Sequence, residues 1–178
     1  MRFEIEITPG MRAFYRLAGS GHIDVMTPEL HEALGMPSYW LAVLLTALLA
    51  GLTIVLHYEA LQQLNRRMPH WTLSHHPRVL VMMFCILAVH ILEIWIFALG
   101  IFLAVSQQGL GQLVGTEPLH FLDVVYASAT TYSTLGYGDL VPRGPLRLVF
   151  GTEALVGFLM ITWSASFAYL EMQRYWRS

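Results

Sequence analysis

The fold is decided by one short stretch of sequence, Thr134-Leu135-Gly136-Tyr137-Gly138-Asp139. Gly136 and Gly138 alternate with larger residues, and glycine adopts positive φ angles at no steric cost. We therefore expect a backbone that alternates between ordinary and positive φ angles. Such an irregular backbone leaves its N–H and C=O groups outside any helix or sheet, so it needs water or other protein groups beside it.

The residues before this stretch predict a short apolar helix. Thr116-Glu117-Pro118 is a typical helix start, with threonine as the cap and proline in the first turn. An apolar run from Leu119 to Tyr132 follows, and we assign the helix to residues 117–133. A run of this length extends about 20 Å as a helix, which is too short to cross the roughly 30 Å of a bilayer core.

Longer apolar segments lie on both sides of this half-helix. Residues 79–105 precede it and contain only His90 and Glu93 as interruptions. The run that follows it is interrupted only by Glu153, and we place its helix at residues 147–172. A further segment, residues 39–64, begins with an uncharged apolar run. None of the three has the polar face of a surface helix, so each is predicted to span a membrane.

The composition also indicates an integral membrane protein. Of the 178 residues 56% are hydrophobic and 12% charged, and the mean hydropathy is +0.54. Soluble domains carry roughly 25% charged residues. The predicted fold class is an all-α membrane protein, with three transmembrane helices and a re-entrant helix between the second and third. The formal net charge of -2 gives no reason to expect nucleic acid as a partner.

The stretch from Thr130 to Leu140, TTYSTLGYGDL, resembles the pore signature of potassium channels, with leucine where valine or isoleucine is commoner. The resemblance covers about residues 80–172 and implies an outer helix, a pore helix, a selectivity filter at 134–139 and an inner helix. It also implies that the Tyr137 ring packs outward against the pore helix and that Asp139 lies at the extracellular mouth. The same resemblance implies that K⁺ is coordinated by one hydroxyl, from Thr134, and by the carbonyl oxygens of Thr134, Leu135, Gly136 and Tyr137.

One filter in each chain determines the expected assembly. A ring of carbonyl oxygens around the ion takes four loops, so we expect a homotetramer in the lipid bilayer. K⁺ is the permeant ion, and no cofactor is predicted. Because Tyr137 and Gly138 are both present, potassium is favoured over mixed cation conduction. Two alternatives stay open: a weakly selective cation channel, and a non-conducting membrane sensor or accessory protein on a pore-like scaffold.

Acidic residues inside the spans are candidates for supporting the filter, because an ionisable group within a membrane is costly and by default points to function. Counting 1.5 Å per residue places Glu153 about 10 Å and Glu93 about 18 Å below the outer ends of their helices, near filter depth. We expect one of them to brace the pore helix or filter through Thr130 or Tyr132. An ordinary structural contact between helices is the alternative. Filter support is assigned to Gly138, Asp139, Thr130 and Glu153.

Three residues are candidates for gating or pH sensing. Gly157 follows Gly138 at about the spacing at which inner helices of the resembled family place a hinge, with close helix packing as the alternative. His90 lies three residues before Glu93, and histidine titrates near neutral pH. We therefore name Gly157, His90 and Glu93 for this role.

Arginines indicate the orientation in the membrane. Arg66, Arg67 and Arg78 lie in or beside the linker at 65–78, and two more, Arg174 and Arg177, lie in the tail. By the positive-inside rule the linker and the C-terminus are cytoplasmic. Residues 1–38 then form an extracellular segment before a pore domain at residues 79–178. We expect the protein in the cell membrane, namely a bacterial inner membrane.

The sequence predicts no catalysis. We find no arrangement typical of a nucleophile, no spacing of metal ligands and no phosphate-binding loop. The spans at 39–64 and 79–105 also lack the spaced arginines of a voltage sensor. What opens the pore is left unassigned.

Overall fold

The computed structural model describes residues 35–71, 75–107 and 109–176. The chain divides into two units, Met1–Pro37 and Ser38–Ser178. The extracellular segment predicted at residues 1–38 lies almost wholly outside the described residues.

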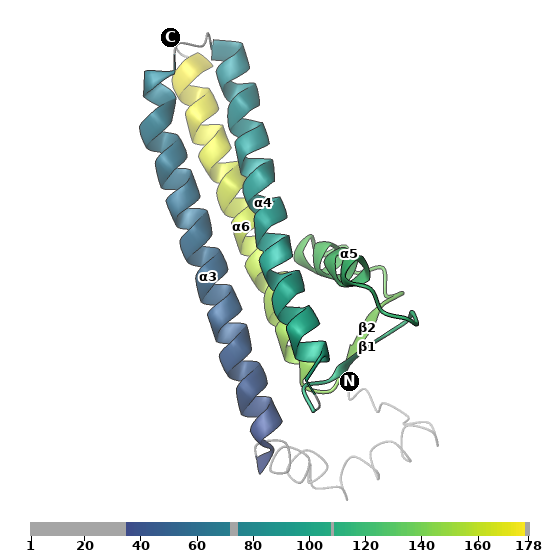
Figure 1. Cartoon of the computed structure of the whole chain (residues 1–178). Helices are drawn as coiled ribbons and strands as arrows, with labels where there is room; N and C mark the ends of the chain where they lie inside the picture. Colours follow the sequence, from purple (N-terminus) through teal and green to yellow (C-terminus); the bar gives the residue numbers. More distant parts are fainter. Residues whose placement is uncertain (1–34, 72–74, 108, 177–178) are drawn as a thin grey trace, which may run out of the picture. The chain divides into compact units, whose positions relative to one another are not determined.

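Three long helices dominate the second unit (Figure 1). Each is long and apolar enough to cross a membrane, over Pro37–His70, Pro77–Val105 and Leu146–Arg174, which confirms the three predicted spans. The described elements in chain order are α3 (Pro37–Arg67), the 3₁₀ turn η1 (Met68–His70), α4 (His75–Val105), β1 (Gln112–Val114), α5 (Phe121–Tyr132), β2 (Val141–Arg143) and α6 (Leu146–Trp176).

The long helices extend beyond the ends predicted from the sequence. Helix α3 continues to Arg67, α4 begins at His75, and α6 runs to Trp176. An apolar run marks only the part of a helix that lies in hydrocarbon, whereas the backbone hydrogen bonds continue into polar turns. Arg66 and Arg67 in the last turn of α3 also complement the helix dipole there.

The short helix α5 begins later than predicted. The predicted start at residue 117, with Thr116 as its cap, is wrong, because the helix begins at Phe121 and its cap is His120. The backbone N–H of His120 donates to Asp123 Oδ2 at 2.8 Å, and the Asp123 N–H donates to the His120 carbonyl oxygen at 3.1 Å. This reciprocal capping satisfies two backbone donors that a helix start leaves open.

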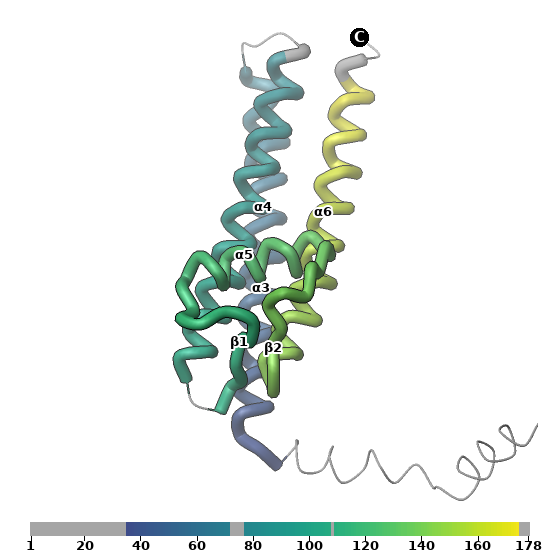
Figure 2. The backbone as a smooth tube through the Cα atoms, turned by 90° about the vertical axis from the view of Figure 1, so that its right-hand side faces the viewer, coloured from purple at the N-terminus to yellow at the C-terminus, as the bar shows by residue number. Residues whose placement is uncertain are grey.

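Helix α5 runs across the long helices instead of along them. It packs against both α4 and α6, which also contact each other, and Figure 2 shows it crossing in front of this pair. Its 12 residues extend about 18 Å. The stretch of residues 134–139, here called the glycine stretch, follows directly after α5. Its position is therefore determined by the C-terminal end of α5.

Helix α3 packs on α4 and α6 through a single stripe. Leu49 lies on Gly100 of α4 so closely that a Cβ added to Gly100 would lie 2.5 Å from the Leu49 Cδ1. Small residues allow such close approach between helices in a membrane. The buried residues of the stripe recur three or four positions apart, as one helix face requires: Ala42, Thr46, Leu49, Thr53, His57, Leu61 and Leu64.

Two three-residue strands, which the sequence did not predict, join the segments before and after α5. β1 pairs with β2 in antiparallel register, with Leu113 opposite Pro142 and Val114 opposite Val141. The next residue, Gly115, has a φ of 142°, and a Cβ there would lie 2.0 Å from the Asp139 carbonyl oxygen. Strands this short carry too few residues for a hydrophobic period to appear in the sequence.

Candidate functional site

The glycine stretch has a backbone with alternating positive φ angles. Thr134, Gly136 and Gly138 have φ angles of 58°, 55° and 80°. A Cβ on Gly136 or Gly138 would meet no atom within 4 Å, so these positions favour glycine for its conformation and not for lack of space. The positive φ of Thr134 was not predicted, because threonine rarely adopts this region.

The N–H groups at the start of the stretch face the end of α5. The Leu135 and Gly136 N–H groups both donate to the Thr130 carbonyl oxygen, with N···O distances of 2.8 Å and 3.0 Å. Such carbonyls at a helix end lack a partner within the helix. The peptide bonds of this stretch are trans, and a trans peptide plane holds C=O opposite N–H. The Thr134 and Leu135 carbonyls therefore point away from α5.

Aromatic side chains connect the second half of the stretch to α5. The Tyr137 ring stacks on the Tyr126 ring of α5, with centroids 6.5 Å apart and planes inclined by 8°. The Tyr126 hydroxyl hydrogen-bonds to the Asp139 side chain. In the single chain Tyr137 is 67% exposed and Leu135 57% exposed. The stretch is thus supported on the α5 side and open on the other.

Glu153 contacts α5 through a serine. Ser128 Oγ lies within hydrogen-bonding distance of Glu153 Oε1 and, at 2.9 Å, of the Ile94 carbonyl oxygen. A hydroxyl has one proton to donate, so both contacts are satisfied when Glu153 carries a proton and donates it to Ser128. The other Glu153 oxygen is buried with no hydrogen-bond partner among the described residues. A neutral carboxyl fits this position, because an unpaired buried charge is far costlier.

Glu93 accepts hydrogen bonds from residues of three helices. Its carboxylate oxygens lie 2.9 Å from His57 Nδ1 of α3 and 3.0 Å from His90 Nδ1 of α4, and the Tyr132 hydroxyl of α5 also donates to it. The His90 Nδ1 is a further 3.0 Å from the Tyr132 oxygen. On the other side, His57 Nε2 lies 3.3 Å from Ser164 Oγ of α6. This cluster connects α3, α4, α5 and α6, and its Tyr132 is the last residue of α5 before the glycine stretch.

The predicted partners of the two acids are therefore only partly brought together. Glu93 contacts Tyr132, whereas Glu153 contacts Ser128 and neither acid contacts Thr130. The Thr130 hydroxyl donates instead to the Ala127 carbonyl oxygen, at 3.0 Å. Helical periodicity predicts which side chains share a face, but not which of them meet across helices.

His57 is the residue of the cluster that the sequence interpretation missed. It lies in α3 with a fully buried side chain, before the charged last turn that holds Arg66 and Arg67. The signal was available, because an ionisable residue in a span is a functional candidate by default. His57, His90 and Glu93 direct ligand atoms to within 4.8 Å of one another, so the donor set can hold a metal ion.

Gly157 lies where α6 meets the end of α5. A Cβ at this position would lie 2.0 Å from the Tyr132 carbonyl oxygen. Helix α6 is continuous through Gly157 from Leu146 to Trp176. The structure thus gives this glycine a packing contact, and its role as a hinge stays a prediction.

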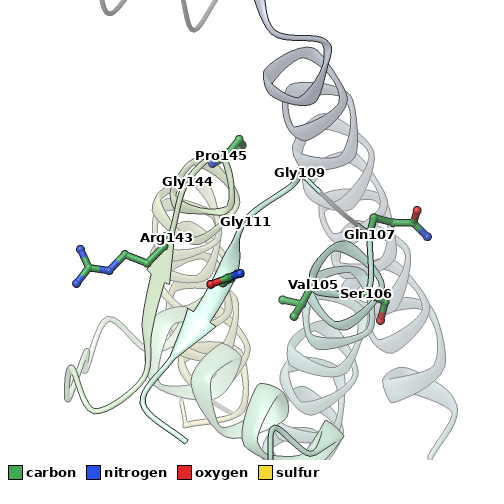
Figure 3. A pocket seen from close by; sticks show the side chains of 9 residues that line it. Val105, Ser106, Gln107, Gly109, Gly111, Arg143, Gly144 and Pro145 are labelled. Carbon is green, nitrogen blue, oxygen red and sulfur yellow. The ribbon is translucent and has the colours of Figure 1, made fainter. Parts of the chain in front are cut away.

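A separate hollow of about 420 Å³ lies beside the connector that follows α4. Arg143 and Gln107 belong to its lining, but Figure 3 shows their side chains directed outward in opposite directions. Much of the remaining lining is glycine, including Gly109, Gly111 and Gly144. Because few polar side chains converge there, we do not assign the functional site to it.

Comparison with known proteins finds similarity to a potassium channel. The inward rectifier potassium channel Kirbac3.1 of Paramagnetospirillum magnetotacticum is 29% identical to the chain over 106 residues, which cover 58% of this chain and 36% of that protein. This chain thus matches little more than a third of the relative's length. No solved structure matches the chain.

The family match covers the two helices that flank the glycine stretch. Residues 79–170, more than half of the chain, match the family described as "Ion channel". The match includes α5 and the glycine stretch, whereas α3 lies outside it. The protein is thus a multi-pass membrane transport protein and not an enzyme. The chain belongs to the ion channel family, in the type whose pore unit has two membrane-spanning helices.

Proposed function

We propose that this chain is a potassium-selective channel subunit and that residues 134–139 form its filter. The observation that carries the proposal is the backbone of this stretch. The Leu135 and Gly136 N–H groups donate to the Thr130 carbonyl oxygen at the end of α5. The Thr134 and Leu135 carbonyls therefore point away from α5. Ordered carbonyl oxygens are what replaces the hydration shell of K⁺ in a filter.

The coordinating groups in this proposal are the carbonyl oxygens of Thr134, Leu135, Gly136 and Tyr137, with the Thr134 hydroxyl. Alternating positive φ angles along the stretch support it, since alternation turns successive peptide planes to a common side. The C-terminal end of α5 also directs partial negative charge toward this region, which favours a cation.

The residues assigned to filter support act through α5 or through the stretch itself. Gly138 contributes a positive φ angle, and Asp139 binds Tyr126 of α5. Glu153 binds Ser128 on the same helix. Thr130 contributes its carbonyl oxygen, which accepts two N–H groups, and not its hydroxyl.

The proposed assembly is a homotetramer in the bilayer. One chain supplies one filter loop, and four loops are needed to surround an ion. The single chain leaves large apolar side chains exposed on the filter and on α6, among them Leu135, Leu155 and Phe158. Contacts between subunits and with lipid would cover these surfaces.

The relative's printed name identifies a potassium channel, which favours K⁺ as the permeant ion here. Inward rectification is part of the name of that relative, and we do not propose it for this chain. For orientation, Arg66 and Arg67 in the last turn of α3 and Arg174 in the last turn of α6 favour a cytoplasmic linker and C-terminus. The filter then faces the outside of the cell, with a bacterial inner membrane as the proposed location.

Reconstitution of the purified chain into planar bilayers tests the proposal. Under a K⁺ gradient opposed by Na⁺, the current should reverse near the K⁺ equilibrium potential. Gly136→Ala should lower K⁺ flux sharply, because its φ of 55° disfavours a side chain. Near-equal permeability to K⁺ and Na⁺ would favour a weakly selective channel. Absence of flux from verified tetramers would favour a non-conducting sensor.

A further inference from the structure

The cluster around Glu93 has features that filter support does not require. His90 and Glu93 lie three residues apart on one face of α4, and His57 approaches them from α3. All three offer donor atoms that lie within 4.8 Å of one another. A hydrogen bond between Glu93 and Tyr132 would brace α5 with a single carboxylate. Two additional imidazoles that face the same carboxylate need a further explanation.

The donor set is one that zinc prefers. Two histidines and one glutamate, with a fourth position left for water or another oxygen, form a common zinc coordination set. A histidine and a carboxylate at i and i+3 also direct their donors to the same side of a helix. Here the third ligand comes from a neighbouring helix, so that the site would connect α3 to α4.

A second group of contacts orients these ligands. Ser164 of α6 contacts the outer ring nitrogen of His57 at 3.3 Å, while the inner nitrogen faces Glu93. Metal-binding histidines usually have their other nitrogen held in this way, which fixes the ring and the tautomer. Tyr132 contacts both Glu93 and His90, and its hydroxyl is positioned to occupy the fourth place.

The size and charge of the cluster also suit a divalent ion. Ligand atoms around tetrahedral zinc lie about 3.4 Å apart. Side-chain rotations that move the donor atoms by about 1 Å would therefore bring them to this spacing. The His57 and Glu93 side chains are fully buried, while His90 is 15% exposed and offers a route of entry. Glu93 contributes one negative charge in surroundings of low dielectric, where its attraction to a cation is strong.

We propose that His57, His90 and Glu93 bind a Zn²⁺-class ion, with the Tyr132 hydroxyl or water as fourth ligand. On binding, each histidine coordinates through Nδ1 and carries its proton on the outer nitrogen. The ion takes the place of the hydrogen bonds between Glu93 and the histidines. Zinc thereby ties α3, which lies outside the family match, to the helix end that carries the filter. The spacing of these ligands in the sequence could not reveal the site, because His57 precedes Glu93 by 36 residues.

Metal content of the intact tetramer tests the site without any measurement of current. The full-length chain is purified in detergent, stripped with a chelator and dialysed against Zn²⁺, and bound zinc is measured by mass spectrometry. We expect about one zinc per subunit for the unmodified chain. Glu93→Gln and His57→Asn should each lose it. His70→Ala is the matched control, because that histidine is exposed and lies outside the cluster. It should bind like the unmodified chain.

Two further measurements separate ligand loss from misfolding. Elution as a tetramer shows that each variant is assembled, and Glu93→Gln keeps the shape of the side chain. Ser164→Ala removes only the group that orients His57, and should weaken zinc affinity about 10-fold or more without abolishing binding. Co²⁺ in place of zinc should give the visible absorption of a tetrahedral site.

The proposal is overturned if the unmodified tetramer retains no zinc, or if the cluster variants retain as much as the His70→Ala control. In the second case the ion binds elsewhere. Both results are independent of conduction, so a chain that binds zinc and passes no K⁺ would refute the proposed function and leave the metal site standing.

Discussion

Gly157 of α6 faces the backbone of Tyr132 so closely that a Cβ would lie 2.0 Å from the Tyr132 carbonyl oxygen, 2.7 Å from its carbonyl carbon and 2.9 Å from its Cα. The neighbouring atoms belong to the backbone, which cannot rotate away as a side chain can. Helix α6 therefore contacts the last residue of α5 through a position that admits only glycine. A displacement of α6 at Gly157 would therefore press directly on the end of α5.

Gly157→Ala should destabilise the subunit, because α5 and α6 must separate to admit the methyl group. Overpacking of this kind costs about 1–3 kcal/mol. Gly151→Ala is the matched control, since a Cβ at that position on the same helix meets nothing within 4 Å. Thermal unfolding of the purified protein checks the difference. Equal stability of both variants, with altered channel opening in Gly157→Ala alone, would favour the hinge.

Glu153→Gln should leave stability nearly unchanged, whereas Glu153→Ala should lower it by about 1–3 kcal/mol. A glutamine can donate its N–H to Ser128, which is then free to donate to the Ile94 carbonyl oxygen as it does in the structure. Denaturant or thermal unfolding of both variants provides the measurement. If glutamine destabilises as much as alanine, then Glu153 is ionised in the folded protein.

Tyr132→Phe should destabilise the contact between α5 and α4, because it removes a hydroxyl that donates to Glu93 and keeps the ring. Leaving a buried carboxylate short of a donor costs about 1–3 kcal/mol. We expect a lower unfolding temperature together with reduced K⁺ over Na⁺ selectivity. The control is Tyr169→Phe, because Tyr169 is an exposed tyrosine of α6. An unchanged Tyr132→Phe protein would show that Glu93 is held by the histidines alone.

Gly115→Ala should lower ion flux through the proposed filter more than Gly109→Ala does. Both glycines have positive φ angles, 142° and 97°, so both substitutions introduce backbone strain. Only the Cβ at Gly115 would collide with backbone, 2.0 Å from the Asp139 carbonyl oxygen. Rubidium uptake by proteoliposomes compares the two. Equal uptake would mean that Asp139, at the end of the proposed filter, tolerates displacement by this loop.

Much of the architecture could be predicted from the sequence, for reasons visible in individual segments. A membrane span needs a long apolar run, and α4 shows one that only His90 and Glu93 interrupt. The positive φ angles of Gly136 and Gly138 follow from the residue type. These properties are local, so a single sequence is enough to reveal them.

What the sequence could not reveal depends on contacts between distant residues. The start of α5 was misplaced because Asp123 caps it through His120, and a histidine is not a favoured capping residue. The partners of Glu93 and Glu153 come from other helices, at sequence separations that no periodicity describes. His57 itself was visible as an ionisable residue of the span predicted at residues 39–64, but its partners were not. Its neighbours become apparent only when α3 is placed beside α4.

The pairing of β1 with β2 determines where the chain can change in length. Val114 opposite Val141 closes a loop that contains α5 and the glycine stretch, and a residue added within either strand must bulge or shift the pairing by one position. A shift of one residue turns every strand side chain to the opposite face. Gly109 lies before the first pair and is exposed, whereas the next two residues, Leu110 and Gly111, are packed against the core and against Arg143. A longer loop therefore costs little at Gly109. A peptide tag or reporter inserted for labelling therefore belongs at Gly109, where the chain can lengthen without moving residues 134–139.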